Sequence, residues 1–105
     1  MTITYTWENV KIYGEREKYP QPLVCSIIDA TLVGTHEDGS ISKTEVRHGL
    51  AHNYDRDLEG YINFDDLTLE NIIIWMEYGL KSTSQWDYYT SIIKEDLDRW
   101  KIKTL

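Results

Sequence analysis

The side chains of this chain that could carry chemistry are three histidines, one cysteine and a run of carboxylates. His48 and His52 stand four residues apart, so on a helix they would share a face and could hold a metal ion, but no third ligand has a diagnostic spacing. His48 is also expected opposite Asp29 in a sheet. Because no nucleophile is placed near them, we interpret these two residues as a cross-strand polar pair. The sequence has no glycine-rich phosphate loop and no serine or cysteine nucleophile motif, so we predict neither enzymatic activity nor a cofactor.

One acidic stretch matches a calcium-binding pattern. Residues 55–66 fit the EF-hand loop, in which oxygen ligands alternate along the chain and a glycine, here Gly60, allows a sharp turn. The candidate carboxylates are those of Asp55, Asp57, Glu59 and Asp66. The last position is an aspartate instead of the longer bidentate glutamate, and the sequence offers no second loop to complete the usual pair. We interpret the stretch as an acidic loop with a chance match, and we keep calcium binding as the alternative.

The charge of the chain is strongly negative. Its 105 residues include 11 basic and 18 acidic side chains, which gives a formal net charge of -7 at pH 7. Much of the excess lies in one acidic cluster, made of Asp55, Asp57, Glu59, Asp65, Asp66 and Glu70. This balance disfavours direct nucleic-acid binding, which needs clustered lysine and arginine. The cluster is typical of a solvated face; the alternative is a surface that binds a basic partner or mimics nucleic acid.

Tryptophan and tyrosine are abundant, with four and eight copies, which are more rings than a core of this size can enclose. Trp75, Tyr78 and Tyr88 fall outside the apolar stripes of the helices that the sequence predicts. Tryptophan and tyrosine are enriched at protein interfaces because they offer a large rigid contact area with a polar end. We therefore predict a protein-binding surface made by these three rings. The alternative is that they are large core residues whose polar tips reach the rim.

The N-terminal half has the period of β-strands. Ile3, Tyr5 and Trp7 alternate with threonines, and the phase then shifts to Val10 and Ile12, which predicts a bulge near residues 8–9. A later strand is apolar on both faces and rich in β-branched residues, so we expect it at the centre of the sheet. This second strand covers residues 23–35, a third covers 41–50, and residues 61–64 are a candidate fourth.

A tight hairpin is expected between the second and third strands. Asp38-Gly39 between two strand-like runs predicts a type I′ turn with a two-residue loop. That loop fixes the register of the two strands, and it is the basis for placing Asp29 opposite His48.

The C-terminal part has the period of helices. Thr68 is the expected N-cap of a first helix that ends at Gly79, and a second helix begins at Ser84 after a short connection. The apolar stripes consist of Leu69, Ile72, Ile73, Met76 and Leu80 in the first helix, and of Trp86, Tyr89, Ile92, Ile93, Leu97 and Trp100 in the second. The order predicts one α+β domain over residues 1–105. In it, a small antiparallel sheet of three to four strands is followed by two antiparallel helices packed on one face.

Cysteine usage and hydropathy bear on the location of the protein. The only cysteine, Cys25, stands in an apolar run, so we expect a buried thiol in a reducing compartment or a reduced virion interior. The longest wholly apolar run, residues 72–76, is far shorter than the roughly 20 residues that a membrane-spanning helix requires. The first residues carry no basic leader, so we expect no secretory signal.

Three short segments of the chain resemble a known group of proteins. They are Thr-Tyr-Thr-Trp at 4–7, Leu-Val-Gly-Thr at 32–35 before the Asp-Gly turn, and Asp-Leu-Thr at 66–68 before the first helix. In these segments the chain resembles a family of small uncharacterised proteins of tailed bacteriophages, including phages of marine bacteria. The chain departs from the family in the charged loop 14–18 and in the acidic stretch 55–59. No catalytic residue is established for the family, so none is carried over.

Two functional hypotheses follow from the rings, the acids and the resemblance. The first is a non-enzymatic bacteriophage protein, a virion structural or assembly component that contacts other virion proteins through exposed rings and edge strands. The alternative is a small acidic phage accessory protein that binds and inhibits a host protein by mimicking nucleic acid. Both imply a virion or host-cytoplasm location and protein partners, with no membrane contact, and both leave a homo-oligomer open.

Overall fold

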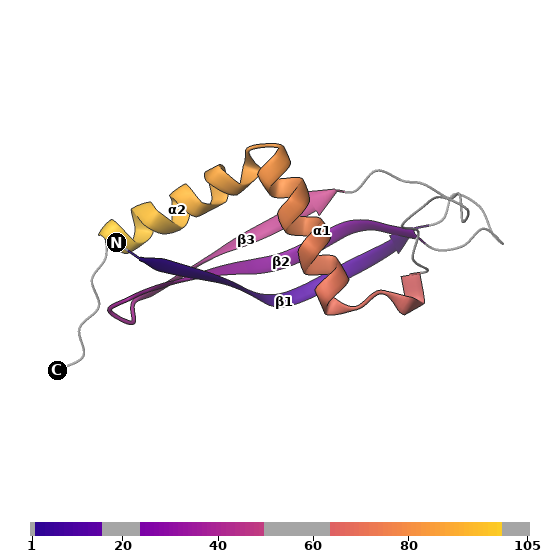
Figure 1. Cartoon of the computed structure of the whole chain (residues 1–105), viewed down its shortest axis with the longest axis horizontal. Coiled ribbons are helices and arrows are strands. Elements are labelled where there is room, and N and C mark those ends of the chain that lie inside the picture. The colour runs from indigo at the N-terminus through magenta and orange to yellow at the C-terminus, as the bar shows by residue number, and fades with distance from the viewer. Residues whose placement is uncertain (1, 16–23, 50–63, 100–105) are drawn as a thin grey trace.

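A computed structural model describes residues 2–15, 24–49 and 64–99 of the protein. Three strands, β1 (Ile3–Glu15), β2 (Val24–His36) and β3 (Ile41–Gly49), form one antiparallel sheet in the order β1-β2-β3, which puts β2 at the centre as predicted. A short 3₁₀ turn, η1 (Phe64–Asp66), precedes the helices α1 (Leu69–Ser82) and α2 (Gln85–Arg99). Figure 1 shows α1 lying across the strands and α2 running along them. The predicted α+β class is confirmed.

β1 changes its pairing at a bulge, as its sequence predicts. The register with β2 shifts between Glu8 and Lys11. Asn9 lies at the shift with φ of 53°, in the left-handed region that asparagine tolerates better than most residues. The inserted residue allows Trp7 and Ile12, which are an odd number of positions apart, to face the same side of the sheet.

The hairpin between β2 and β3 has a three-residue loop, so the predicted two-residue type I′ turn is wrong. The His36 N–H donates to the Ser40 carbonyl at 2.8 Å, and the Gly39 N–H donates to the His36 carbonyl at 2.8 Å. A type I′ turn needs positive φ at both central residues. Here φ is positive, at 92°, for Gly39 but not for Asp38. The arrangement is that of a type I turn closed by one left-handed glycine.

The longer loop moves the β2–β3 register by one residue. Asp29 pairs with Arg47, and the predicted pairing of Asp29 with His48 is therefore wrong. Because side chains alternate along a strand, a one-residue slip exchanges the two faces. Asp29 and Arg47 lie on the face of the sheet that is turned away from the helices, whereas the His48 ring lies against Gly79 of α1.

The core lies between the sheet and the two helices. Its most buried side chains are Ile28, Leu32, Val46, Ile72, Met76, Leu80, Ile93 and Leu97. The stripes predicted for the helices contribute most of the helical side of the core. Four of their members do not belong to it: Ile73 is only partly buried and outside the core cluster, Leu69 and Ile92 are exposed, and Trp100 lies outside the described residues. α2 approaches β2 very closely at Gly34, where a Cβ atom would overlap with Cγ2 of Ile93.

The N-terminus of α1 is as predicted, whereas its C-terminus is not. Thr68 is the N-cap, and it exchanges hydrogen bonds with Asn71 in a capping box. α1 does not end at Gly79 but continues to Ser82, and the absence of a side chain on Gly79 leaves room for the His48 ring. Phe64 lies in η1, so it is not part of a fourth strand, and the rest of that predicted strand lies outside the described residues.

Candidate functional site

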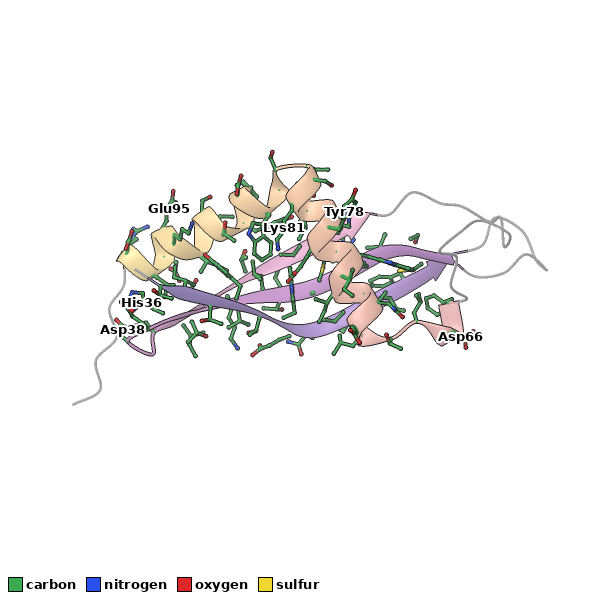
Figure 2. All side chains as sticks on the ribbon, in the orientation of Figure 1. His36, Asp38, Asp66, Tyr78, Lys81 and Glu95 are labelled. Atoms are coloured by element: carbon green, nitrogen blue, oxygen red, sulfur yellow. The ribbon has the colours of Figure 1, made fainter. Side chains whose placement is uncertain are left out.

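Two of the three rings predicted to bind protein point into solvent. Tyr78 of α1 is 76% exposed and Tyr88 of α2 is 63% exposed, and Figure 2 shows Tyr78 on the outer side of its helix. Trp75 is only partly exposed and packs against the core, as the alternative interpretation described. The exposed aromatic surface of the helices is therefore built on Tyr78 and Tyr88.

Each exposed ring has an aliphatic neighbour one helical turn away. Ile74 of α1 is 57% exposed and stands four residues before Tyr78, and Ile92 of α2 is 36% exposed and stands four residues after Tyr88. Residues four apart are neighbours on a helix surface. Ile74 could have been identified from the sequence by its spacing from Tyr78, whereas Ile92 was assigned to the buried stripe. We call these pairs the α1 patch (Ile74 and Tyr78) and the α2 patch (Tyr88 and Ile92).

A second group of aromatic rings packs between the helices and the sheet. The Trp86 ring lies 5.5 Å from the Tyr5 ring and 6.3 Å from the Trp7 ring, measured between centroids. The Trp7 indole N–H donates to the Glu77 carboxylate at 3.0 Å, and Lys81 Nζ lies 5.0 Å from the Trp86 ring centroid. These rings hold the helices against the sheet. Of the many aromatic residues in the sequence, some therefore stabilise the fold and others are exposed.

Tyr5 has one unusual atom. Its hydroxyl oxygen is buried and has no hydrogen-bond partner, and burial raises the pKa of this group. An unpaired buried hydroxyl costs free energy relative to a hydrated one. The ring is retained in this position by its edge-to-face contact with Trp86.

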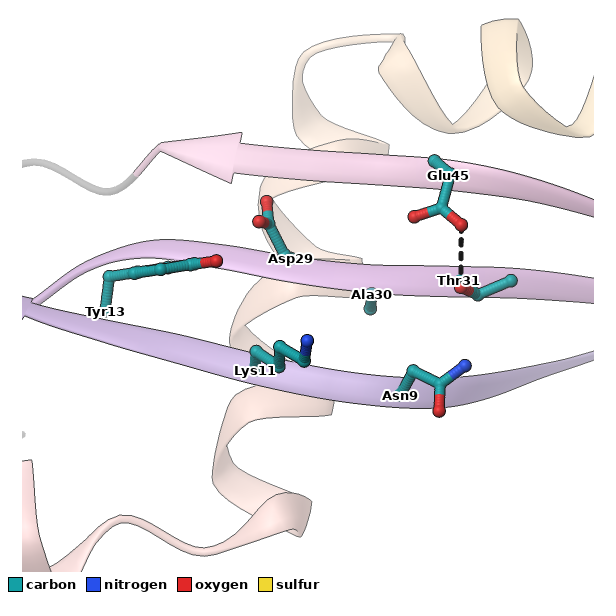
Figure 3. A pocket seen from close by; sticks show the side chains of 7 residues that line it. All are labelled: Asn9, Lys11, Tyr13, Asp29, Ala30, Thr31 and Glu45. Atoms are coloured by element: carbon teal, nitrogen blue, oxygen red, sulfur yellow. Dashed lines mark hydrogen bonds between the residues drawn. The ribbon is translucent and has the colours of Figure 1, made fainter.

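No described element covers the second face of the sheet. On this open face Arg47 donates two hydrogen bonds of 2.7 Å to Asp29, and Lys43 contacts Glu8 at 3.0 Å. The hydrogen bonds from Arg47 are the largest cause that lowers the pKa of Asp29. A shallow polar cavity of about 270 Å³ lies beside the β1 bulge (Figure 3) and is lined by Asn9, Lys11, Tyr13, Asp29, Ala30, Thr31 and Glu45. Of its two acids, Asp29 is bound by Arg47, and Glu45 accepts a hydrogen bond from the Thr31 hydroxyl at 3.3 Å.

Two of the three histidines and the cysteine lie among the described residues. His36 Nδ1 lies 2.9 Å from the Asp38 carboxylate at the hairpin, and His48 packs on Gly79. His52 lies outside the described residues, so the pair of His48 and His52 is not placed. Cys25 is buried as predicted, and burial raises the pKa of its thiol. This shift keeps the sulfur in its less reactive protonated form.

The acidic cluster is placed only in part. Asp65, Asp66 and Glu70 are exposed in η1 and the first turn of α1. The other three acids, Asp55, Asp57 and Glu59, lie outside the described residues, as do most of the calcium candidates. Within residues 2–15, 24–49 and 64–99, no group of three potential metal-ligating side chains comes together.

The comparisons with known proteins give no relative. No protein-family model matches the chain, and searches of curated proteins and of solved structures return no significant match. Neither α1 nor α2 is long and apolar enough to span a membrane.

Proposed function

We propose that the protein is a non-enzymatic bacteriophage protein, a virion structural or assembly component that acts through protein–protein contacts. The observation that supports this function is the exposure of Tyr78 and Tyr88 on the outer sides of two helices whose inner sides form the core. The phage context rests on the resemblance in segments 4–7, 32–35 and 66–68.

The two patches have properties that favour binding. Each is carried by a helix that is fixed to the core, so little backbone freedom is lost when a partner binds. The Tyr88 ring rests edge-to-face on Tyr89 with centroids 5.2 Å apart, which limits its motion before binding. A tyrosine and an isoleucine one turn apart provide the apolar anchor, and the tyrosine hydroxyl provides a polar end.

The experiment that tests this function compares two variants in phage particles. The double variant Tyr78→Ser with Tyr88→Ser removes both rings from exposed positions, and Lys94→Ser changes another exposed residue of α2 as the control. We expect the control to enter purified particles at the wild-type copy number, and the double variant to be depleted at unchanged abundance in the lysate. Equal incorporation of both variants would show that the patches are not the contact surface.

The second candidate function is the acidic accessory protein that binds a host protein. It is favoured by the exposed carboxylates of Asp65, Asp66 and Glu70, which follow one another at the start of the helical layer. The test is reversal of these three charges to lysine, followed by affinity capture of host proteins from infected cells. Unchanged capture of a specific host protein would contradict binding through this cluster.

A further inference from the structure

β1 has one edge that no strand of the described residues covers. Its other edge pairs with β2 without interruption from Ile3 opposite His36 to Glu8 opposite Thr31. In the sheet formed by the described residues β1 is terminal, so half of its backbone N–H and C=O groups point away from β2. A free edge of this kind is a template for pairing with another strand.

The first half of this edge lacks the features that normally prevent such pairing. Residues 3–7 are Ile-Thr-Tyr-Thr-Trp, which are all β-branched or aromatic, with no charge and no proline. The second half of β1 is different, because it contains the bulge at Asn9 and the charge of Lys11. The opposite edge strand, β3, carries Lys43, Glu45 and Arg47 on its open side. The unprotected edge is therefore confined to residues 3–7.

We propose that residues 3–7 pair with the same residues of a second copy of the chain, antiparallel and centred on Tyr5. In this register Thr4 lies opposite Thr6 of the second copy, and Ile3 lies opposite its Trp7. Threonine meets threonine on the open face, and an aliphatic side chain meets an aromatic ring on the helix side, which are favourable cross-strand pairs. The contact is isologous and joins two three-stranded sheets into one sheet of six strands.

The charge distribution is compatible with a second copy at this edge. The whole chain has a net charge of -7, but residues 3–7 contribute none of it. On the open face three acids and three bases, Glu8, Asp29, Glu45, Lys11, Lys43 and Arg47, cancel. Most of the excess acids of the described residues lie on the helices and in η1. Glu77, which accepts a hydrogen bond from the Trp7 indole, is also paired with Lys81 at 3.8 Å, and the acidic hairpin adjoins the start of β1 through a hydrogen bond from the Glu37 N–H to the Thr2 carbonyl. Because two negative chains still repel at long range, added salt is expected to strengthen the dimer.

This inference deepens the proposed function by assigning one protein contact to a second copy, and it uses neither Tyr78 nor Tyr88. Its failure is therefore separable from failure of the proposed function. The double variant Tyr78→Ser with Tyr88→Ser is expected to form the dimer as the wild type does. A wild-type chain that enters particles but is monomeric would contradict only the inference made here.

The test is the molar mass of the purified chain by sedimentation over a dilution series, together with two charge variants. Thr4 and Thr6 are exposed on the open face, so their substitution leaves the core intact. Thr4→Lys with Thr6→Lys places like charges opposite each other twice across the dimer, and Thr4→Glu with Thr6→Glu does the same. We expect each double variant to weaken the dimer by about tenfold or more. An equimolar mixture of the two variants restores it, because introduced lysines then face introduced glutamates.

The control variant changes the opposite edge of the sheet, which the proposed dimer does not use. Ile41→Lys adds a charge at an exposed position on the opposite edge strand and is expected to leave the dimer unchanged. Thermal melting of each variant verifies that the monomer is folded. A wild-type chain that stays at 12.4 kDa at the highest concentration would overturn the proposal. So would charge variants that dimerise as well as the wild type, or a mixture that does not recover.

Discussion

Gly34 is the position at which the packing of α2 on the sheet can be tested most sharply. A Cβ atom built on Gly34 would overlap with Cγ2 of Ile93 and come within 3.2 Å of Cγ2 of Ile3. Ile93 is fully buried, and its Cγ2 is bonded directly to Cβ, so relief of the overlap requires a shift of the helix or of the strand. Overpacking of a core typically costs about 1–3 kcal/mol. We therefore expect Gly34→Ala to lower the free energy of unfolding by about 2 kcal/mol, which corresponds to a decrease in Tm of roughly 10 °C.

Gly49 provides the matched control for this substitution. It is also a strand glycine, its φ is not positive, and a Cβ atom there would meet nothing within 4 Å. Gly49→Ala removes the same freedom from the unfolded chain without a clash, so it is expected to be neutral or to stabilise by about 0.5 kcal/mol. Urea denaturation of both variants at one pH measures the difference.

A double-mutant cycle identifies the clash itself. Ile93→Ala alone is expected to cost about 2–5 kcal/mol, because it opens a cavity in the core. With the shorter side chain at 93, Gly34→Ala has room and is expected to cause no further loss. The coupling free energy of the cycle is then about 2 kcal/mol. Equal costs of Gly34→Ala in both backgrounds would refute the close approach of α2 to β2.

Three further predictions concern the cap, the hairpin and the exposed rings. Thr68→Ala removes the N-cap of α1 and is expected to cost about 1 kcal/mol, measured by urea denaturation; no change would contradict the capping box. Hydrogen bonds from the Ser40 backbone N–H and side chain hold the pKa of Asp38 well below its usual range. This carboxylate therefore stabilises the fold above its unfolded-state pKa of about 3.9, and the contribution is lost as the pH falls toward its lower folded-state pKa. The difference in stability between wild type and Asp38→Asn is expected to shrink as the pH is lowered below about 4, and a difference that grows would contradict the direction of the shift. Tyr78→Ser and Tyr88→Ser are expected to change the free energy of unfolding by no more than about 0.5 kcal/mol, because both rings are exposed; a larger loss would show that they support the fold.

The features predicted correctly from the sequence are those set by local chemistry. The apolar character of both faces of β2 placed it at the centre of the sheet, the phase change in β1 predicted the bulge near residues 8–9, and Thr68 was identified as an N-cap. Each of these signals lies within a few residues of the feature that it predicts. The exposure of Tyr78 and Tyr88 follows in the same way from their position off the helical stripe.

The wrong predictions concern features for which the local sequence allows two conformations and a contact with a residue distant in sequence selects one of them. Asp38-Gly39 fits a two-residue loop as well as the observed three-residue loop, and the pairing of the two strands selects between them. The three-residue loop sets the register in which Asp29 pairs with Arg47. Glycine is typical of the residue that ends a helix, but Gly79 lies inside α1. Its missing side chain leaves room for the ring of His48, which belongs to a strand far away in the sequence. Trp75 lies off the stripe, yet the core of this two-layer fold reaches far enough to cover part of it.

Quantitative mass spectrometry of purified phage particles, beside a lysate of infected cells, tests the central claim most directly. For a virion structural component we predict a fixed copy number per particle that does not change with further purification. Abundance in the lysate with absence from the particles would contradict that role and would favour the acidic accessory protein as the function.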